Sequence, residues 1–123
     1  MNQPPKIIYT HEDFVVINKP PGISVHGGNR IVGPTLTDWL VQQFPEIKMV
    51  GDNPSMRPGL VHRLDKETSG VMVVARAQKS FERLKHLFKN RLVEKKYLTL
   101  VAGRLVPRTG IIDLKIGRLI KKS

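Results

Sequence analysis

Val71-Met72-Val73-Val74-Ala75 is the longest uninterrupted apolar run in the chain, and the predicted fold is built outward from it. A short continuous run of this kind is typical of a β-strand that is buried on both faces. Over residues 79–92 the periodicity becomes helical, with basic side chains on one side and apolar side chains on the other. The apolar side consists of Phe81, Leu84, Leu87, Phe88 and Leu92. The pattern therefore predicts a buried strand followed by an amphipathic helix.

Two more strands are predicted near the N-terminus, at residues 7–10 and 14–19. Both are rich in β-branched and aromatic residues, and the turn-like His11-Glu12-Asp13 separates them. Pro20-Pro21-Gly22 ends the second strand, because proline has no N–H to donate to a sheet. We expect the two strands to form a hairpin.

Between the hairpin and the apolar run, the chain is predicted to hold one short helix between two loops. The helix ends at Phe44, before a proline, and either Thr35 or Thr37 could cap its N-terminus. The glycine-rich residues 27–34 precede it, and the proline- and glycine-containing residues 45–59 follow it as a long loop.

The end of the chain is predicted to add strands at residues 96–101 and 111–116, each next to a glycine. Strand pairs interrupted by helices favour the α+β class. At 123 residues the chain is long enough for one domain or a piece of one.

The positive charge of the chain lies entirely in its second half. Residues 1–60 carry five basic and five acidic side chains, whereas residues 61–123 carry 16 basic and five acidic ones. A field of this sign attracts polyanions, of which nucleic acid is the commonest in a cytoplasm. The alternative is a basic surface that serves only solubility.

Several classes of site are excluded by what the sequence lacks. Without cysteine there is no disulfide framework, thiol catalysis or thiolate metal site. The four histidines lack metal-ligand spacing, and none of the serines has a nucleophile-elbow context. Residues 28–35 match a phosphate-binding loop except that proline replaces the lysine. We expect no cofactor or metal, and with no membrane span or secretory signal we expect a cytoplasmic location.

The richest stretch for chemistry is His62-Arg63-Leu64-Asp65-Lys66-Glu67-Thr68-Ser69-Gly70. In an extended segment Arg63 and Asp65 project from the same side and Leu64 from the other. The guanidinium favours an ionised carboxylate, which is a competent nucleophile toward a sugar or an electrophilic ring. Taken locally, the same residues could equally form a structural ion pair beside a tight turn.

Three stretches follow one another along the chain: Asn18-Lys19-Pro20-Pro21-Gly22-Ile23-Ser24-Val25-His26, then the stretch at 62–70, then Lys95-Lys96-Tyr97-Leu98-Thr99-Leu100-Val101-Ala102-Gly103. Together they resemble the motifs of the pseudouridine synthases that modify large-subunit ribosomal RNA and transfer RNA. The Arg-Leu-Asp-x-x-Thr-Ser-Gly element is highly specific to that family, and the other two are weaker alone. The resemblance covers roughly residues 7–103.

This resemblance implies an enzyme that isomerises uridine in ribosomal or transfer RNA to pseudouridine. The C1′–N1 bond breaks, the uracil of a flipped-out nucleotide rotates, and C5 rejoins the sugar. Asp65 would be the catalytic aspartate, acting by attack at C1′, addition at C6 or deprotonation at C2′. Arg63 would fill the space of the extruded nucleotide or bind its phosphate. Tyr97 would stack on the target base, unless it is a strand tyrosine packed in the core.

The resemblance also implies a mixed, largely antiparallel sheet flanked by helices. Residues 1–123 are expected to be the N-terminal portion of the catalytic domain, truncated at the C-terminus and without the auxiliary RNA-binding domain. The family's later Gly-Arg-x-His-Gln-Ile-Arg-like motif has no match after Gly103. That departure leaves an alternative, a catalytically silent RNA-binding module derived from the same family.

Overall fold

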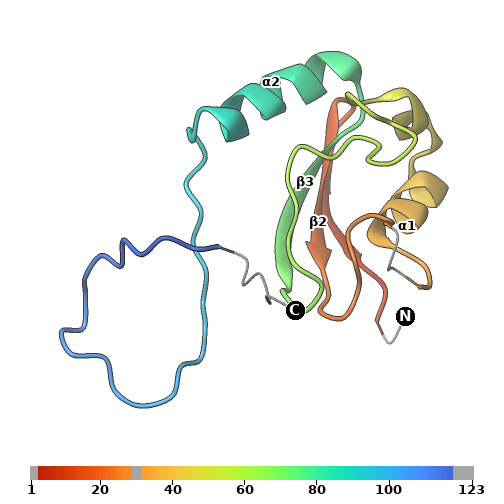
Figure 1. Ribbon diagram of the computed structural model, residues 1–123. Helices are drawn as coiled ribbons and strands as arrows, with labels where there is room; N and C mark the ends of the chain where they lie inside the picture. Colours follow the sequence, from red (N-terminus) through yellow and green to blue (C-terminus); the bar gives the residue numbers. More distant parts are fainter. Residues whose placement is uncertain (1–2, 29–31, 118–123) are drawn as a thin grey trace, which may run out of the picture.

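A three-stranded antiparallel sheet and two α-helices organise the chain in the computed structural model, which describes residues 3–28 and 32–117 (Figure 1). The sheet order is β1-β2-β3. Along the chain the elements are β1 (Lys6–Thr10), β2 (Phe14–Lys19), α1 (Leu36–Gln43), the 3₁₀ helix η1 (Pro45–Met49), β3 (Gly70–Ala75) and α2 (Gln78–Lys89). The α+β prediction and the N-terminal hairpin are confirmed.

The main hydrophobic core lies between one face of the sheet and α1. Successive side chains of a strand point to opposite faces, so the alternate residues Val15 and Ile17 of β2 turn inward, where both are fully buried. They share one cluster with Leu36 and Leu40 of α1, which are also fully buried. Figure 1 shows α1 beside the sheet on this side.

Strand β3 is buried mainly on one face, so the prediction that residues 71–75 are buried on both faces was wrong. Met72 and Val74 are fully buried, but Val71 is 64% exposed. The face opposite the main core is covered by α2 near the end of β3, where Ala75 joins a small cluster with the first turns of that helix. An antiparallel sheet covered incompletely on one face gives alternating burial.

Helix α1 begins after a capping box, which decides between the two threonines. Thr35 is the N-cap: its side chain accepts a hydrogen bond from the Asp38 N–H, and the Asp38 carboxylate accepts one from the Thr35 N–H at 2.8 Å. Thr37 is the second helical residue. The loop that follows is more regular than predicted, because the proline at its start begins η1. Of the glycine-rich loop, residues 29–31 lie outside the described part.

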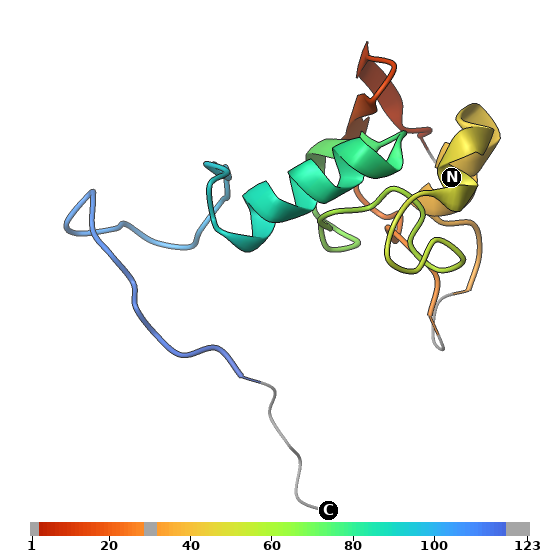
Figure 2. The same cartoon turned by 90° about the horizontal axis from the view of Figure 1, so that it is seen from above.

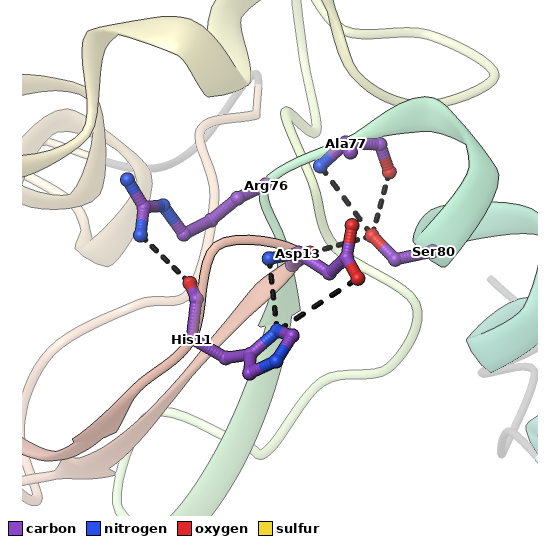
Figure 3. Close-up of polar contacts among 5 residues, drawn as sticks. All are labelled: His11, Asp13, Arg76, Ala77 and Ser80. Carbon is purple, nitrogen blue, oxygen red and sulfur yellow. Dashed lines mark hydrogen bonds and ion pairs between the residues drawn. The ribbon is translucent and has the colours of Figure 1, made fainter.

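Arg76 joins the hairpin turn to the start of α2 (Figure 3). Its backbone N–H donates to the carbonyl of Asp13 at 2.8 Å and its Nη1 donates to the carbonyl of His11 at 2.7 Å. The Ser80 hydroxyl donates to the same Asp13 carbonyl. The Arg76 guanidinium also forms an ion pair with Glu46 of η1, with 2.6 Å between Nη2 and Oε1. These bonds hold four segments together at the end of the sheet away from Lys19.

Gly59 lets the chain run against the free edge of β3. Its φ of +66° is in the left-handed region, and a Cβ atom there would collide with the Ala75 carbonyl oxygen. The Ala75 N–H donates to the Gly59 carbonyl at 2.9 Å, and Leu60 forms an isolated antiparallel bridge with Val74.

Helix α2 is slightly shorter than the predicted 79–92. The chain leaves the helix at Arg91, whose φ is +57°, and the Leu92 N–H then donates to the Leu87 carbonyl at 2.9 Å. Leu92 lies outside the helix and is 65% exposed. The predicted apolar side of the helix is therefore only partly used for packing.

The strands predicted at residues 96–101 and 111–116 do not form. Among the described residues, 93–117 contain no helix or strand and are almost entirely exposed. This segment forms a wide, extended loop in Figure 1 and leads away from the sheet in Figure 2. A strand is stabilised by pairing with a neighbour, and none of the described strands pairs with this segment.

Within the described part of the chain, neither α1 nor α2 is long and apolar enough to cross a membrane.

Candidate functional site

The candidate aspartate stands in solvent on a turn that leads into β3. The Asp65 carbonyl accepts a hydrogen bond from the Thr68 N–H at 3.1 Å, which closes the turn. Its side chain is 87% exposed, and the Arg63 guanidinium lies 4.0 Å from one carboxylate oxygen with 59% of its own side chain exposed. An exposed pair at this distance contributes little to stability. Both groups are therefore free to meet a ligand.

Leu64 anchors this exposed pair to the protein. It is 8% exposed and belongs to the main core cluster. The predicted alternation is confirmed, since Arg63 and Asp65 are exposed on either side of the buried leucine.

Lys19, at the end of β2, binds the main chain of the turn that carries Asp65. Its side chain is fully buried, and its ammonium donates to the carbonyls of Pro20 at 2.9 Å, Ile23 at 3.0 Å and Lys66 at 3.0 Å. All three protons of the ammonium are used. The Gly22 N–H donates to the same Lys66 carbonyl at 2.8 Å. The residue after the candidate aspartate is thus bound by the last residue of β2, 47 positions earlier in the sequence.

The charge of Lys19 is balanced by acidic groups of the turn. Burial lowers the pKa of the Lys19 ammonium, and the negative charges of Glu67 and Asp65 act to raise it. A buried cation therefore lies beneath the exposed carboxylates, in addition to the arginine at their side.

Tyr97 lines an open cavity beside this turn. The cavity has a volume of about 780 Å³ and lies between the start of β3, the C-terminal end of α2 and the segment after it. Tyr97 is 65% exposed, so it is not packed in a core. Among the described residues, the lining includes Thr68 to Val71 but neither Arg63 nor Asp65. The structure thus places the tyrosine next to the turn that carries the aspartate, but not in contact with the carboxylate.

In the described residues, one group of side chains has the geometry to hold a metal ion. His11, Glu12 and Asp13 bring their ligand atoms within 4.8 Å of one another in the hairpin turn. The His11 Nδ1 already accepts a hydrogen bond from the Asp13 N–H at 3.1 Å. This arrangement explains the turn itself, and it lies far along the sheet from Asp65.

Two residues of the site carried no role in the sequence analysis, namely Lys19 and His62. The signal for Lys19 was available: it continues the inward-facing alternation of Val15 and Ile17, so a strand at 14–19 places it in the core. No local signal marked His62, because its partners lie in other elements: its ring accepts a hydrogen bond from the Val73 N–H of β3 and stacks on Phe88 of α2.

Comparison with known proteins identifies the family of this chain. Residues 13–123 match the family described as RNA pseudouridylate synthase. An uncharacterised RNA pseudouridine synthase of Mycobacterium bovis is 41% identical over 112 residues, covering 91% of this chain and 36% of the relative. Ribosomal large subunit pseudouridine synthase D of Nitrosomonas europaea is 37% identical over 115 residues, covering 94% and 32%.

A solved structure is similar as well. Human RNA pseudouridylate synthase domain containing 4 superposes with a TM-score of 0.51 at 38% identity, covering 71% of this chain and 30% of that one. The chain spans about a third of the length of these relatives. With a family match over most of its residues, the chain belongs to the RNA pseudouridylate synthase family.

Proposed function

We propose that the protein isomerises uridine in ribosomal or transfer RNA to pseudouridine, with Asp65 as the catalytic aspartate. In this reaction the C1′–N1 bond breaks and a C1′–C5 bond forms, while C5 loses a proton to solvent and N1 gains one. No electron is transferred and no external group is added. The proposal assigns to this chain the activity in the name of its family, RNA pseudouridylate synthase.

The observation that carries the proposal is the exposed Asp65 carboxylate on a turn that is held from beneath. Leu64 is buried before it and the Lys66 carbonyl is bound by Lys19 after it. The main chain on both sides of the aspartate is therefore held in place while its carboxylate stays exposed, which favours attack on a nucleotide brought to it.

Arg63 and Tyr97 are proposed to bind the substrate. Arg63 lies beside the carboxylate. There its guanidinium could bind a phosphate or fill the space that the flipped nucleotide leaves. Tyr97 presents an exposed ring at a cavity next to the same turn, and stacking of a base on such a ring contributes about 1–3 kcal/mol. The 16 basic side chains of residues 61–123 would supply phosphate contacts.

We further propose that residues 1–123 are the N-terminal portion of the catalytic domain, acting in the cytoplasm. Supporting this, relatives that are named as pseudouridine synthases are about three times as long and align over nearly the whole chain.

The test is release of tritium from RNA that contains 5-tritiated uridine, measured with the full-length protein. We expect release by the natural protein and background release by Asp65→Asn, because the amide cannot serve as nucleophile or base. Glu12→Gln is the matched control, since it neutralises an exposed carboxylate in the hairpin turn.

Full activity of Asp65→Asn would overturn the role of the aspartate. RNA binding that weakens steeply with salt, without tritium release by the natural protein, would replace the enzyme by the RNA-binding module.

A further inference from the structure

The chain leaves the edge of β3 immediately before Arg63. Residues 59–60 run along this edge, where the Ala75 N–H donates to the Gly59 carbonyl. The next N–H of β3 that points to the same edge belongs to Val73, two residues earlier. In a continued ladder a backbone carbonyl would accept it. Here the acceptor is a side chain, Nε2 of His62, at 3.1 Å.

The His62 ring is held from a second side by α2. It stacks on the ring of Phe88, with centroids 4.4 Å apart and an interplanar angle of 12°. The Lys95 ammonium lies 5.3 Å from the centre of the same Phe88 ring. The imidazole therefore bridges the sheet edge and the helix.

The ring is neutral at physiological pH. Burial, and secondarily the charge of Lys95, lower the pKa of His62 to about 4. Since Nε2 accepts from a backbone N–H, the single proton of the neutral ring lies on Nδ1. Phe88 and Val73 bring no charge to the ring, and the other charged side chains that line the same cavity are Glu67, Glu94 and Lys96.

We propose that His62 is a positioning residue for Asp65, because its imidazole replaces a ladder carbonyl and lets the main chain leave the sheet at the right place. With the Val73 N–H satisfied by a side chain, the backbone of Arg63 turns away while Leu64 enters the core. His62 holds the segment before Asp65, as Lys19 holds it after. The effect on catalysis rests on the proposed function, whereas the hydrogen bond itself does not.

Two substitutions in the full-length protein distinguish the role of His62 as a hydrogen-bond acceptor from its role as an aromatic ring. His62→Phe keeps a ring for Phe88 but leaves the Val73 N–H without an acceptor, whereas His62→Gln offers a neutral amide oxygen. We expect kcat for tritium release to fall about 10-fold in His62→Phe, the scale of one unsatisfied, partly buried donor, with little change in KM. His62→Gln should keep kcat within about threefold. His86→Gln, an exposed histidine of α2, is the control.

The hydrogen bond between the Val73 N–H and His62 can be tested without measuring enzymatic activity. Nuclear magnetic resonance of the natural protein should show His62 protonated on Nδ1 and titrating near pH 4. Amide exchange at Val73 should quicken in His62→Phe and not in His86→Gln. Titration near 6.5, a proton on Nε2 or unchanged exchange would overturn the hydrogen bond. Equal kcat for His62→Phe and the natural protein would overturn the positioning role. If neither protein releases tritium, the proposed function is overturned instead.

Discussion

The described residues up to 92 and the segment 93–117 differ far more in structure than in sequence character. Both contain apolar runs with β-branched residues, but Ile17 and Leu40 in the first region are fully buried, whereas Leu98 and Leu100 in the second are fully exposed. The first region has a sheet whose strands pair and a helix that covers them. The difference teaches that strand-forming composition is not enough: a strand forms where a neighbour offers hydrogen bonds and a face to bury.

The largest effect is expected from a cavity in the packed region. Leu40→Ala removes a fully buried side chain from the cluster between α1 and the sheet, and should destabilise the chain by about 3 kcal/mol. Urea unfolding followed by circular dichroism measures this change. A loss below about 1 kcal/mol would mean that the core is loosely packed and that the two regions differ less than the structure indicates.

A smaller effect is expected from removing the buried charge beneath the turn. Lys19→Met keeps the length of the side chain but leaves the carbonyls of Pro20 and Ile23 without their donor, for a cost of about 2 kcal/mol. Part of the loss is offset because no ammonium has to be desolvated.

The matched control is Lys48→Met in η1, which removes an exposed charge. Chemical unfolding of both variants should separate them clearly. If they are equally stable, the contacts of Lys19 are not what holds the turn.

The smallest effect is expected in the segment 93–117. Leu100→Ala removes a side chain that is 100% exposed, so the unfolding free energy of the 123-residue chain should change by less than about 0.5 kcal/mol. The same unfolding measurement applies. A loss as large as that of Leu40→Ala would show that this segment packs against the sheet, and the contrast between the regions would disappear.

Much of the packed region could be predicted because its signals are local. Alternation at 14–19, the threonine cap before α1 and the amphipathic pattern of α2 each depend on residues close in sequence. The exposed Arg63 and Asp65 around a buried Leu64 followed from the same alternation. The strands at 96–101 and 111–116 failed because pairing depends on a distant neighbour. The prediction that β3 is buried on both faces was wrong for a similar reason: the sequence of a strand does not show which elements cover its two faces.

The sequence by itself determined the family, the α+β class and the position of the candidate aspartate, because these rest on a specific motif and on short-range periodicity. Only the tertiary structure decided what holds that aspartate in place. Lys19 reaches the Lys66 carbonyl across 47 positions, and His62 meets Val73 and Phe88 from two other elements. Such contacts arise only in the folded chain, since a buried ammonium or imidazole is stable only where folding brings partners to it.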